Sequence, residues 1–458
     1  MTYTKEMAEK KTLAAKYQKK SDREHVLDNP DTYTGAMEHT EYATYIYDDK
    51  TDTIVAKELE IIPGLYKLFD EGAVNCRDHQ VRQSQAAAAA KPNIMPVTRI
   101  EFSIEDDGTI TMFNDGNGID IAKHPEHDIW IPEMIFGHLR TSTNYDKTQK
   151  KIVGGKNGFG FKLVLIWSTW GKVETVDHVR GLKYIQEFSD NLSVINSPTV
   201  TKCGGKPYTK VTFKPDFARL KLDGLSKDML ALFKRRVYDI AAVTDKKVKV
   251  KYNDELLNVK TFQQYIDLYI GSKADTKRIH EEANERWEYA VCMAPSEEFT
   301  QVSFVNGIFT SKGGKHVEYL LGQIVRKLQA YISKKKKVDV KPSTIKEQIM
   351  LFVRCDVENP TFDSQTKDHM TTPSSKFGSS CDVSDKFIEK VAKLGIMDAA
   401  CALTEVKENK EAKKTDGSKT KSVRGIHKLV DANDAGTKNS TNCTLLLVEG
   451  DSAKAGVV

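Results

Sequence analysis

The sequence has few of the features that mark secreted, membrane-spanning or disulfide-stapled proteins. Its seven cysteines are scattered along 458 residues with no CxxC pair, so they predict neither a disulfide framework nor a zinc site. No apolar run approaches the roughly 20 residues that span a bilayer, and the N-terminal stretch MTYTKEMAEKKTLAAKYQKK lacks the apolar core of a signal peptide. These absences predict an intracellular protein in a reducing compartment, without a membrane partner.

Charge of one sign is not in large excess either. The formal net charge is +5, from 69 Lys and Arg against 64 Asp and Glu, which permits nucleic-acid binding without arguing for it. The chain is 39% hydrophobic and 29% charged, as in ordinary globular proteins, and its length suits about two or three domains.

Helical and strand patterns alternate from about residue 55 to 255, which predicts a mixed α/β domain. Residues 61–79 have helical spacing, and 98–115 have the pattern of a hairpin that turns at Asp107 and Gly108. The alanines at 86–90 extend the helix until prolines force a loop. The Lys- and Glu-rich stretch through about residue 28 reads as a mobile or partner-clasping arm.

A second α/β segment follows. Residues 301–316 lead from a strand into a glycine turn, and 317–337 form an amphipathic helix with lysines at its end, which suit the helix dipole. The highly charged stretch 404–421 predicts an exposed linker or a frayed helix. The run 443-CTLLLVEG-450 is typical of a buried strand that presents Glu449 at its C-terminal end.

The stretch 153-VGGKNGFGFKLVL-165 raises the question of a phosphate loop. A P-loop needs Lys directly after the last glycine and then Ser or Thr, whereas Phe161 follows Gly160. A dinucleotide fingerprint needs a further glycine where Leu163 stands. What remains is a glycine turn whose backbone N–H groups cradle phosphate, or a flexible turn before a buried element.

Polar residues occur at two places before this turn. Glu71, Asn75 and Asp78 share one face of the first predicted helix. Asn is an uncharged magnesium ligand and Glu a general base for water, although such a face is also simply the wet side of a helix. In 113-FNDGNGID-120, a buried Asp115 would accept the exocyclic amine of adenine, and the same residues make good turn chemistry.

In this order, the polar helix, the DGxG turn and the glycine turn resemble the ATP-binding fold shared by gyrase-type topoisomerases, heat-shock chaperones, MutL proteins and histidine kinases. The resemblance implies an α+β fold, with a Bergerat-type (GHKL) mixed sheet that has helices on one face, followed by a transducer α/β domain. It implies that Glu71 is the water-activating base, Asn75 the magnesium ligand and Asp115 the adenine contact. Residues 154–162 would be the lid whose amides and Lys162 meet the phosphates.

Further motifs resemble eukaryotic-type topoisomerases of class IIA over nearly the whole chain: 24-EHVLDNPDTYTG-35, 141-TSTNYD-146, 303-SFVNGIFTSKGGKHVEYL-320, 358-ENPTFDSQTKD-368 and 431-DANDAG-436. In that family a Gln-Thr-Lys segment reaches from the transducer into the ATP site, which implies a catalytic role for Lys367 on the terminal phosphate. The nucleotide contacts implied by the resemblance are Tyr17, Asn75, Asp78, Asp115, Gly118, Ile119, Ser142, Thr143, Asn144, Gly155, Lys156, Asn157, Gly158, Phe159, Gly160, Lys162, Gln365 and Lys367.

The stretch 449-EGDSAKAG-456 resembles the start of a TOPRIM domain, in which Glu449 would join a later Asp-x-Asp pair to bind magnesium. Neither that pair nor the catalytic tyrosine of the family is found here, so we expect no DNA cleavage by this chain alone. Basic side chains would bind the phosphates of double-stranded DNA, without sequence-specific contacts to the bases. The basic residues expected to face it are Lys312, Lys315, Arg326, Lys327, Lys334, Lys335, Lys336 and Lys337.

The sequence departs from the family pattern at three positions. His79 stands where the pattern has a second Asn on the helix, Asp115 where it has Asn, and Lys156 where it has Arg. Because Lys lacks bidentate geometry, we expect Lys156 to bind phosphate less tightly. The source is left open between a divergent eukaryote and a large DNA virus, and the location between the nucleus and, for a virus, the host nucleus, a cytoplasmic factory or the virion.

The expected function is the ATP-operated N-gate of a type IIA topoisomerase, in which two copies bind Mg-ATP, dimerise and trap a DNA duplex. The expected parts are an arm (1–28), the GHKL ATPase domain (29–255), the transducer (256–400), a charged linker (401–442) and the start of TOPRIM (443–458). Two alternatives stay open. One is a chaperone-like or MutL-like clamp with the same ATP fold, and the other is a non-catalytic fragment that binds nucleotide or DNA.

Overall fold

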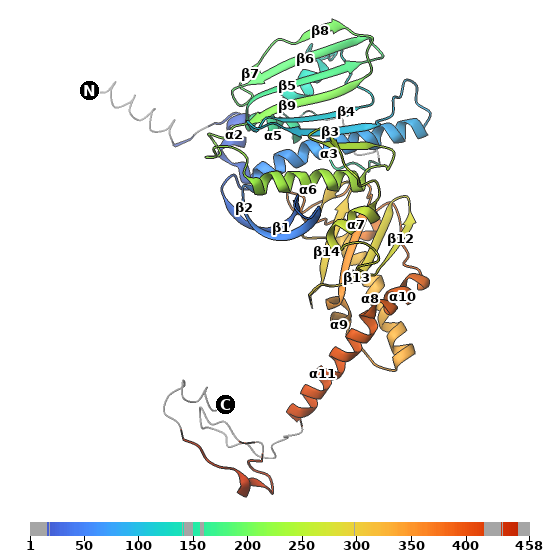
Figure 1. The fold of residues 1–458 in the computed structure, drawn as a ribbon. Helices are drawn as coiled ribbons and strands as arrows, with labels where there is room; N and C mark the ends of the chain where they lie inside the picture. Colours follow the sequence, from blue (N-terminus) through green and yellow to red (C-terminus); the bar gives the residue numbers. More distant parts are fainter. Residues whose placement is uncertain are drawn as a thin grey trace, which may run out of the picture.

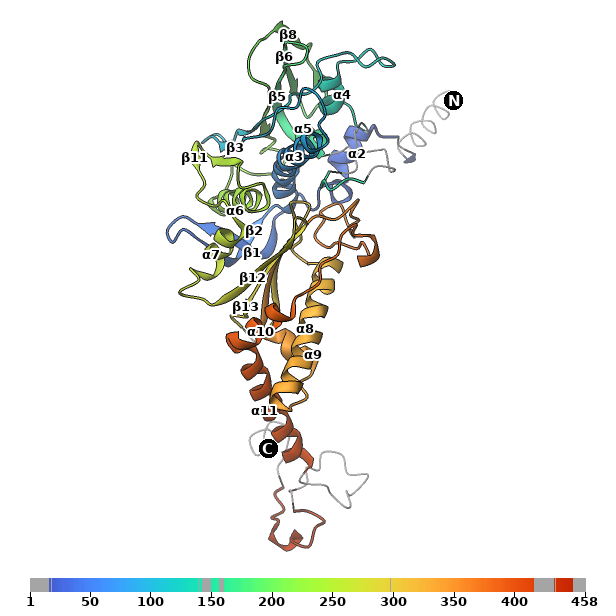
Figure 2. The same ribbon diagram turned by 90° about the vertical axis from the view of Figure 1, so that its right-hand side faces the viewer.

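The structure is a computed structural model, and it describes residues 16–17, 19–139, 141, 150–155, 160–296, 298–415, 432 and 434–447. Two bodies are stacked along one long axis, and a helix projects beyond the second (Figures 1 and 2). The described strands form a two-stranded hairpin, a nine-stranded sheet and a five-stranded sheet. In this part of the chain, no helix is both long and apolar enough to cross a membrane.

The first body is built on the nine-stranded sheet, with the order β11-β10-β3-β4-β9-β5-β6-β7 and β8 beside β6. The sheet is mixed, because β10 runs parallel to β3 while the other pairs are antiparallel. The predicted hairpin is confirmed as β3 and β4. The strands are β3 (Arg99–Ile104), β4 (Ile110–Asp115), β5 (Ser168–Asp177), β6 (Leu182–Ser189), β7 (Val194–Ile195), β8 (Thr199–Lys202), β9 (Tyr208–Pro215), β10 (Lys249–Tyr252) and β11 (Glu255–Leu256).

Helices lie along one face of this sheet, below it in Figure 1. The longest, α3, begins with Pro63 at its first position, where the missing N–H costs nothing. As predicted, it runs into the alanines, and it ends at Ala88. It buries apolar side chains such as Leu68 and Phe69 while presenting a polar stripe near its middle. The helices of the first body are α3 (Pro63–Ala88), α4 (Ile131–Gly137), α5 (Gly160–Ile166) and α6 (Lys227–Val243).

The last part of the predicted N-terminal arm is helical. Residues 22–28 form α2 (Asp22–Asp28), which begins with a capping box between Ser21 and Glu24. Its Val26 is completely buried, so this turn of helix docks on the first body instead of standing free. The short 3₁₀ turn Pro30–Thr32 and the hairpin of β1 (Thr40–Asp48) and β2 (Thr53–Ile61) follow.

The second body contains the five-stranded sheet in the order β12-β13-β16-β14-β15. The strands β14 and β16 are parallel and are joined across one face by α8 and α9. The turn between β14 and β15 consists of Asn306 and Gly307, both with positive φ. The elements are β12 (Arg278–Asn284), β13 (Trp287–Met293), β14 (Thr300–Val305), β15 (Ile308–Phe309), α8 (Lys315–Lys336), α9 (Pro342–Glu347), β16 (Ile349–Cys355) and the 3₁₀ turn Ser374–Lys376.

The boundary between the bodies lies in continuous packing. Helix α7 (Phe262–Ile270) buries Phe262, Tyr265 and Ile266 in a cluster that the first body shares with strands β13, β14 and β16 of the second. The packing of the first body therefore continues past residue 255, where the sequence suggested a division, into the second body.

The C-terminal part differs from the sequence-based expectation at two places. After α10 (Asp385–Val391) and a π-helical turn (Ala392–Ile396), α11 (Met397–Thr415) projects from the second body and occupies the first part of the predicted linker (Figure 1). The predicted buried strand is wrong for residues 443–447, in which Leu447 is 84% exposed, because this run pairs with no strand in the described part of the chain. A 3₁₀ turn (Ser440–Asn442) precedes it, and Glu449 lies outside the described residues.

Candidate functional site

Glu71 lies near the middle of α3, and two lysines contact its carboxylate. The Nζ atom of Lys67, one turn earlier, is 2.9 Å from Oε1, and that of Lys367, in the loop after β16, is 3.2 Å from the same oxygen. Burial alone would raise the pKa of Glu71, but Lys367 and Lys67 outweigh it, so the pKa is lowered. Glu71 is therefore a buried anion held by one cation from its own helix and one from the second body.

The same cluster continues to α6. Asp70 accepts from Lys67 at 2.8 Å and from Arg236 at 2.6 Å, and Arg236 also donates to the carbonyl of Gly307 at 2.8 Å. Burial would raise the pKa of Asp70, but the two cations lower it. Nearly two turns beyond Glu71, Arg77 pairs with Asp356 at 2.6 Å. Helix α3 is thus tied to the second body by buried ionic contacts along its length.

Asp78 anchors the glycine turn to α3. Its two carboxylate oxygens accept from the amides of Gly154 and Gly155, each at 2.8 Å. The side chain is completely buried, and burial raises its pKa even though Arg82 and Arg77 act in the opposite direction. In this structure Asp78 therefore fixes the start of the glycine turn to α3.

The start of α5 lies directly against Glu71. A Cβ atom on Gly160 would stand 2.7 Å from Oε2 of Glu71 and 3.7 Å from Nδ2 of Asn75, so only glycine lets the two helices approach this closely. Two residues on, Lys162 donates to the carbonyl of Thr141 at 2.6 Å, and burial lowers its pKa to about 8. The Glu71 carboxylate and the Asn75 amide thus lie beside the first residue of α5, and Lys162 follows in its first turn.

The structure places Asp115 differently from the expectation. Its carboxylate accepts from the amides of Thr98 at 2.7 Å and Arg99 at 2.8 Å and from the Thr98 hydroxyl, so it fastens the start of β3. Because side chains alternate along a strand, the adjacent Asn114 faces the other way. That face carries Met112, whose Sδ lies 2.2 Å from where a Cβ on Gly72 would stand. Asn114, only 7% exposed, therefore shares the face that packs on α3.

The turn after β4 brings backbone close to β5. A Cβ on Gly118 would stand 2.0 Å from the carbonyl oxygen of Val176, and the amide of Ile119 donates to Thr175 Oγ1 at 3.0 Å.

On α3, His79 has a buried Nε2 without a hydrogen-bond partner among the described residues. Burial and the nearby Arg82 lower the pKa of His79 to about 4, so the imidazole is neutral near pH 7.

The loop that carries Lys367 is fixed to the second body. Asp368 accepts from the hydroxyls of Ser311 at 2.9 Å and Thr366 at 2.8 Å, and Lys367 itself has a positive φ of 63°. This geometry carries the lysine across to a helix 296 positions earlier in the chain. Gln365 in the same loop is half-buried, while Tyr17 at the other end of the chain is 71% exposed.

Other predicted nucleotide contacts, Ser142, Thr143, Asn144, Lys156, Asn157, Gly158 and Phe159, lie outside the described residues. Sequence reasoning missed Lys67 and Arg236. The three- and four-residue spacing from Lys67 to Asp70 and Glu71 was a readable signal, because such residues are neighbours on a helix. Nothing local identified Arg236, since its partners come from α3 and from the turn before β15.

The predicted basic surface follows α8, which lies along one flank of the second body (Figure 2). Three of its residues are paired: Lys315 with Glu318 at 2.7 Å, Lys327 with Asp385 at 2.9 Å, and Lys336 with Asp398 at 3.1 Å. Such pairs leave less positive charge for an anionic partner. The remaining exposed members are Lys312, Arg326, Lys334, Lys335 and Lys337.

Comparison with known proteins gives relatives for nearly the whole chain. The model of the DNA gyrase B family matches residues 251–421. DNA topoisomerase 2 of Drosophila melanogaster is 42% identical over 96% of this chain, and that of Acanthamoeba polyphaga mimivirus is 43% identical over 97%. The chain spans only 30% and 35% of these two relatives.

Solved structures match the fold as well. The ATPase region of Saccharomyces cerevisiae topoisomerase II superposes with a TM-score of 0.79 at 41% identity, over 86% of this chain and 100% of that one. The ATPase and transducer domains of DNA topoisomerase II from Balamuthia mandrillaris give a TM-score of 0.79 at 38% identity, over 86% and 98%.

Proposed function

The chain belongs to the DNA topoisomerase II family, and from this membership and the contacts of Glu71 we propose that it binds and hydrolyses Mg-ATP as the N-terminal gate of such an enzyme. The observation that carries the proposal is the buried contact between Glu71 and Lys367. Phosphoryl transfer depends on positioning and on neutralising charge at the transferred group, and a carboxylate, a lysine and a glycine turn supply these functions.

Glu71 acts as the base that orients the attacking water and takes its proton. While Lys367 and Lys67 hold its carboxylate, the lowered pKa makes it a weak base. When Lys367 moves to the terminal phosphate, Glu71 loses that cation and its basicity rises. The base therefore becomes competent when the second body has engaged the nucleotide, which couples hydrolysis to the arrangement of the two bodies.

Asn75 would hold the magnesium ion that accompanies ATP. Its amide lies with Glu71 around the bare backbone of Gly160, and an amide oxygen together with phosphate oxygens suits the preference of magnesium for oxygen ligands. When bound, the ion would neutralise charge on the phosphates. Lys162, two residues after Gly160, adds a second cation in the first turn of α5.

Recognition of the adenine belongs to Asn114 in this proposal, in place of Asp115. Both oxygens of Asp115 are engaged at the start of β3, whereas Asn114 lies on the α3 side of the strand. An amide can both accept from and donate to a base, which a carboxylate cannot. The other contacts in the proposal are Gly118, Ile119, Ser142, Thr143, Asn144, Lys156, Asn157, Gly158, Phe159, Gln365 and, from a second copy of the chain, Tyr17.

The role of the gate is to capture duplex DNA for strand passage in the longer enzyme. Two copies would close on ATP and hold the duplex between their second bodies, with the free lysines of α8 meeting phosphates regardless of sequence. In this proposal Glu449 contributes to a magnesium site that further residues complete. The proposed location is that of the DNA: the nucleus or, for a viral protein, the host nucleus, a cytoplasmic factory or the virion.

The test is steady-state Mg-ATP hydrolysis per chain as a function of protein concentration, with Glu71→Ala and, as the matched control, Glu60→Ala on the exposed edge of β2. We expect the wild-type rate per chain to climb with concentration, Glu60→Ala to match it, and Glu71→Ala to bind nucleotide without turnover. Turnover that survives in Glu71→Ala would contradict the assigned base. Wild-type activity no higher than that of Glu71→Ala would favour the alternative of a non-catalytic nucleotide- or DNA-binding chain.

A further inference from the structure

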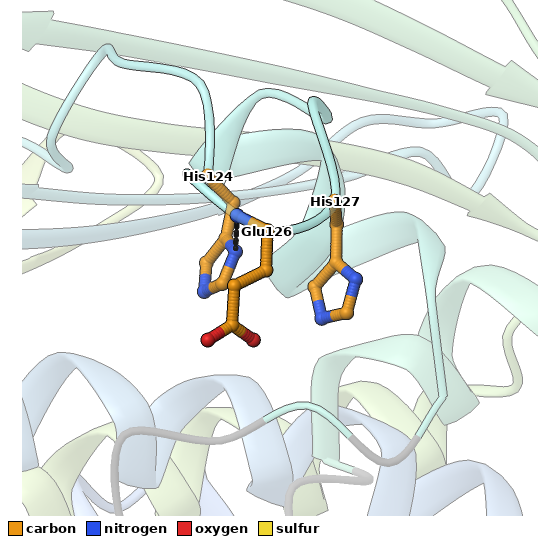
Figure 3. A group of neighbouring side chains, drawn as sticks. All are labelled: His124, Glu126 and His127. Atoms are coloured by element: carbon orange, nitrogen blue, oxygen red, sulfur yellow. Dashed lines mark hydrogen bonds between the residues drawn. The ribbon is translucent and has the colours of Figure 1, made fainter.

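The turn between β4 and α4 carries a group of side chains that the nucleotide site does not use. His124, Glu126 and His127 each offer one ligand atom, and these atoms lie within 4.8 Å of one another. Figure 3 shows the three side chains extending from the same side of the turn, with the Glu126 carboxylate next to the His124 ring and the His127 ring to their right. Two imidazoles and one carboxylate form a common set of protein ligands for a borderline divalent ion.

The backbone of this turn is held without any ligand. The amide of His124 donates to the carbonyl of Ile129 at 2.7 Å, and that of Asp128 donates back to His124 at 3.0 Å. Lys123 pairs with Asp128 at 3.0 Å and forms a β-bridge with Trp130. Because these bonds fix the chain on both sides of the three side chains, a bound ion would need to order side-chain rotamers only, which lowers the cost of binding.

The two imidazole rings are stacked face to face. Their centroids are 4.8 Å apart, with an angle of 21° between the planes. His124 is half-buried, while Glu126 and His127 are exposed, so further coordination positions stay open to water. We propose that this turn binds one divalent ion of the zinc class through His124, Glu126 and His127.

One contact sets the strength of the proposed site. The amide of Glu126 donates to Nδ1 of His124 at 3.2 Å, which places the proton of the neutral ring on Nε2. Coordination through Nε2 requires the ring proton to move to Nδ1, so Nδ1 can no longer accept the hydrogen bond from the Glu126 amide. The site is therefore weaker than a closed four-ligand zinc centre, and it loads only when free zinc is raised.

The experiment titrates the untagged, chelator-stripped 458-residue chain with Zn²⁺ in a zinc buffer, without nucleotide, and counts bound metal after equilibrium dialysis. The variants are the double substitution His124→Ala, His127→Ala and the single substitution Glu126→Gln. The matched control is His39→Ala, since His39 also lies beside a carboxylate, that of Glu60 at 3.6 Å. A Cys203→Ser background removes a half-buried thiol that could bind zinc on its own.

We expect one ion per chain, unchanged by His39→Ala, with affinity lowered at least about tenfold by Glu126→Gln and lost in the double variant. Thermal unfolding without metal should be the same for all variants, because the substituted side chains lie on the surface of the turn. Equal zinc binding by the double variant and the wild type would overturn the proposal, as would a wild-type chain that takes up no zinc at any concentration at which it stays dissolved. None of these outcomes depends on ATP hydrolysis.

Discussion

Asn306 is the side chain whose loss should most directly separate the glycine turn from the second body. It is fully buried at the β14–β15 turn, where Nδ2 donates to the carbonyls of Val153 at 3.1 Å and Val357 at 2.9 Å, and Oδ1 accepts from the amide of Val357 at 2.7 Å. One amide therefore joins the start of the lid, the turn and the loop after β16.

The expected cost of Asn306→Ala follows from these bonds. Each buried partner left unsatisfied costs about 1–3 kcal/mol, so the three lost bonds predict about 3–9 kcal/mol. A water molecule entering the vacated space would move the value toward the lower end. Alanine at a φ of 50° adds backbone strain of about 1–2 kcal/mol.

Asn306→Gly separates the two contributions, because it deletes the same hydrogen bonds but tolerates the positive φ. Urea unfolding followed by tryptophan fluorescence reports on both bodies, since Trp287 lies in the second body and the other three tryptophans in the first. Hydrogen exchange at the Val357 amide reports the lost bond directly. We expect Asn306→Gly to be destabilised by the hydrogen-bond part alone and Asn306→Ala by slightly more. An Asn306→Gly protein within about 1 kcal/mol of wild type, with a protected Val357 amide, would refute this reasoning.

Two further predictions concern the nucleotide site. Gly160→Ala should lower ATP turnover by about a hundredfold, because the added Cβ would stand 2.7 Å from Oε2 of Glu71 and displace the base by a fraction of an ångström or more. The control is Gly322→Ala, where no heavy atom lies within 4 Å of the added Cβ. Equal turnover rates in the two variants would contradict the prediction. Burial lowers the pKa of Lys162 to about 8, below its value of about 10.4 in the unfolded chain. The folded protein therefore loses this proton at a lower pH than the unfolded chain does. Between these two pH values the lysine becomes neutral in the folded protein, and the free energy of unfolding rises with pH. The affinity for Mg-ATP, measured by calorimetry from pH 7 upward, should therefore fall above about pH 8 and stay level in Lys162→Arg, and parallel curves for the two proteins would exclude Lys162 as the titrating group.

Local periodicity was enough to predict α3, the β3–β4 hairpin and α8, because each repeats its apolar residues at the spacing of one element. The position of Lys367 beside Glu71 could be expected only from the resemblance to a family, since no pattern links residues so far apart. The role given to Asp115 overlooked the alternation of β4: Ile110 and Met112 are buried, which places Asn114 on the same side. The run at 443–447 looked like a strand by composition, yet a strand also needs a partner edge, and composition does not supply one.

The ionic contacts along α3 have a consequence for how the two bodies can move. Glu71 meets Lys367, Asp70 reaches the turn at Gly307 through Arg236, and Arg77 meets Asp356, and the side chains of Glu71, Lys367, Asp70, Arg236 and Arg77 are buried. A buried ion pair cannot be stretched by an ångström or two without leaving charge uncompensated, so half-way positions cost more than either end. The second body should therefore occupy discrete positions relative to α3, with no stable intermediate position. A nucleotide whose phosphate replaces Glu71 as the partner of Lys367 would shift the equilibrium from one position to the other.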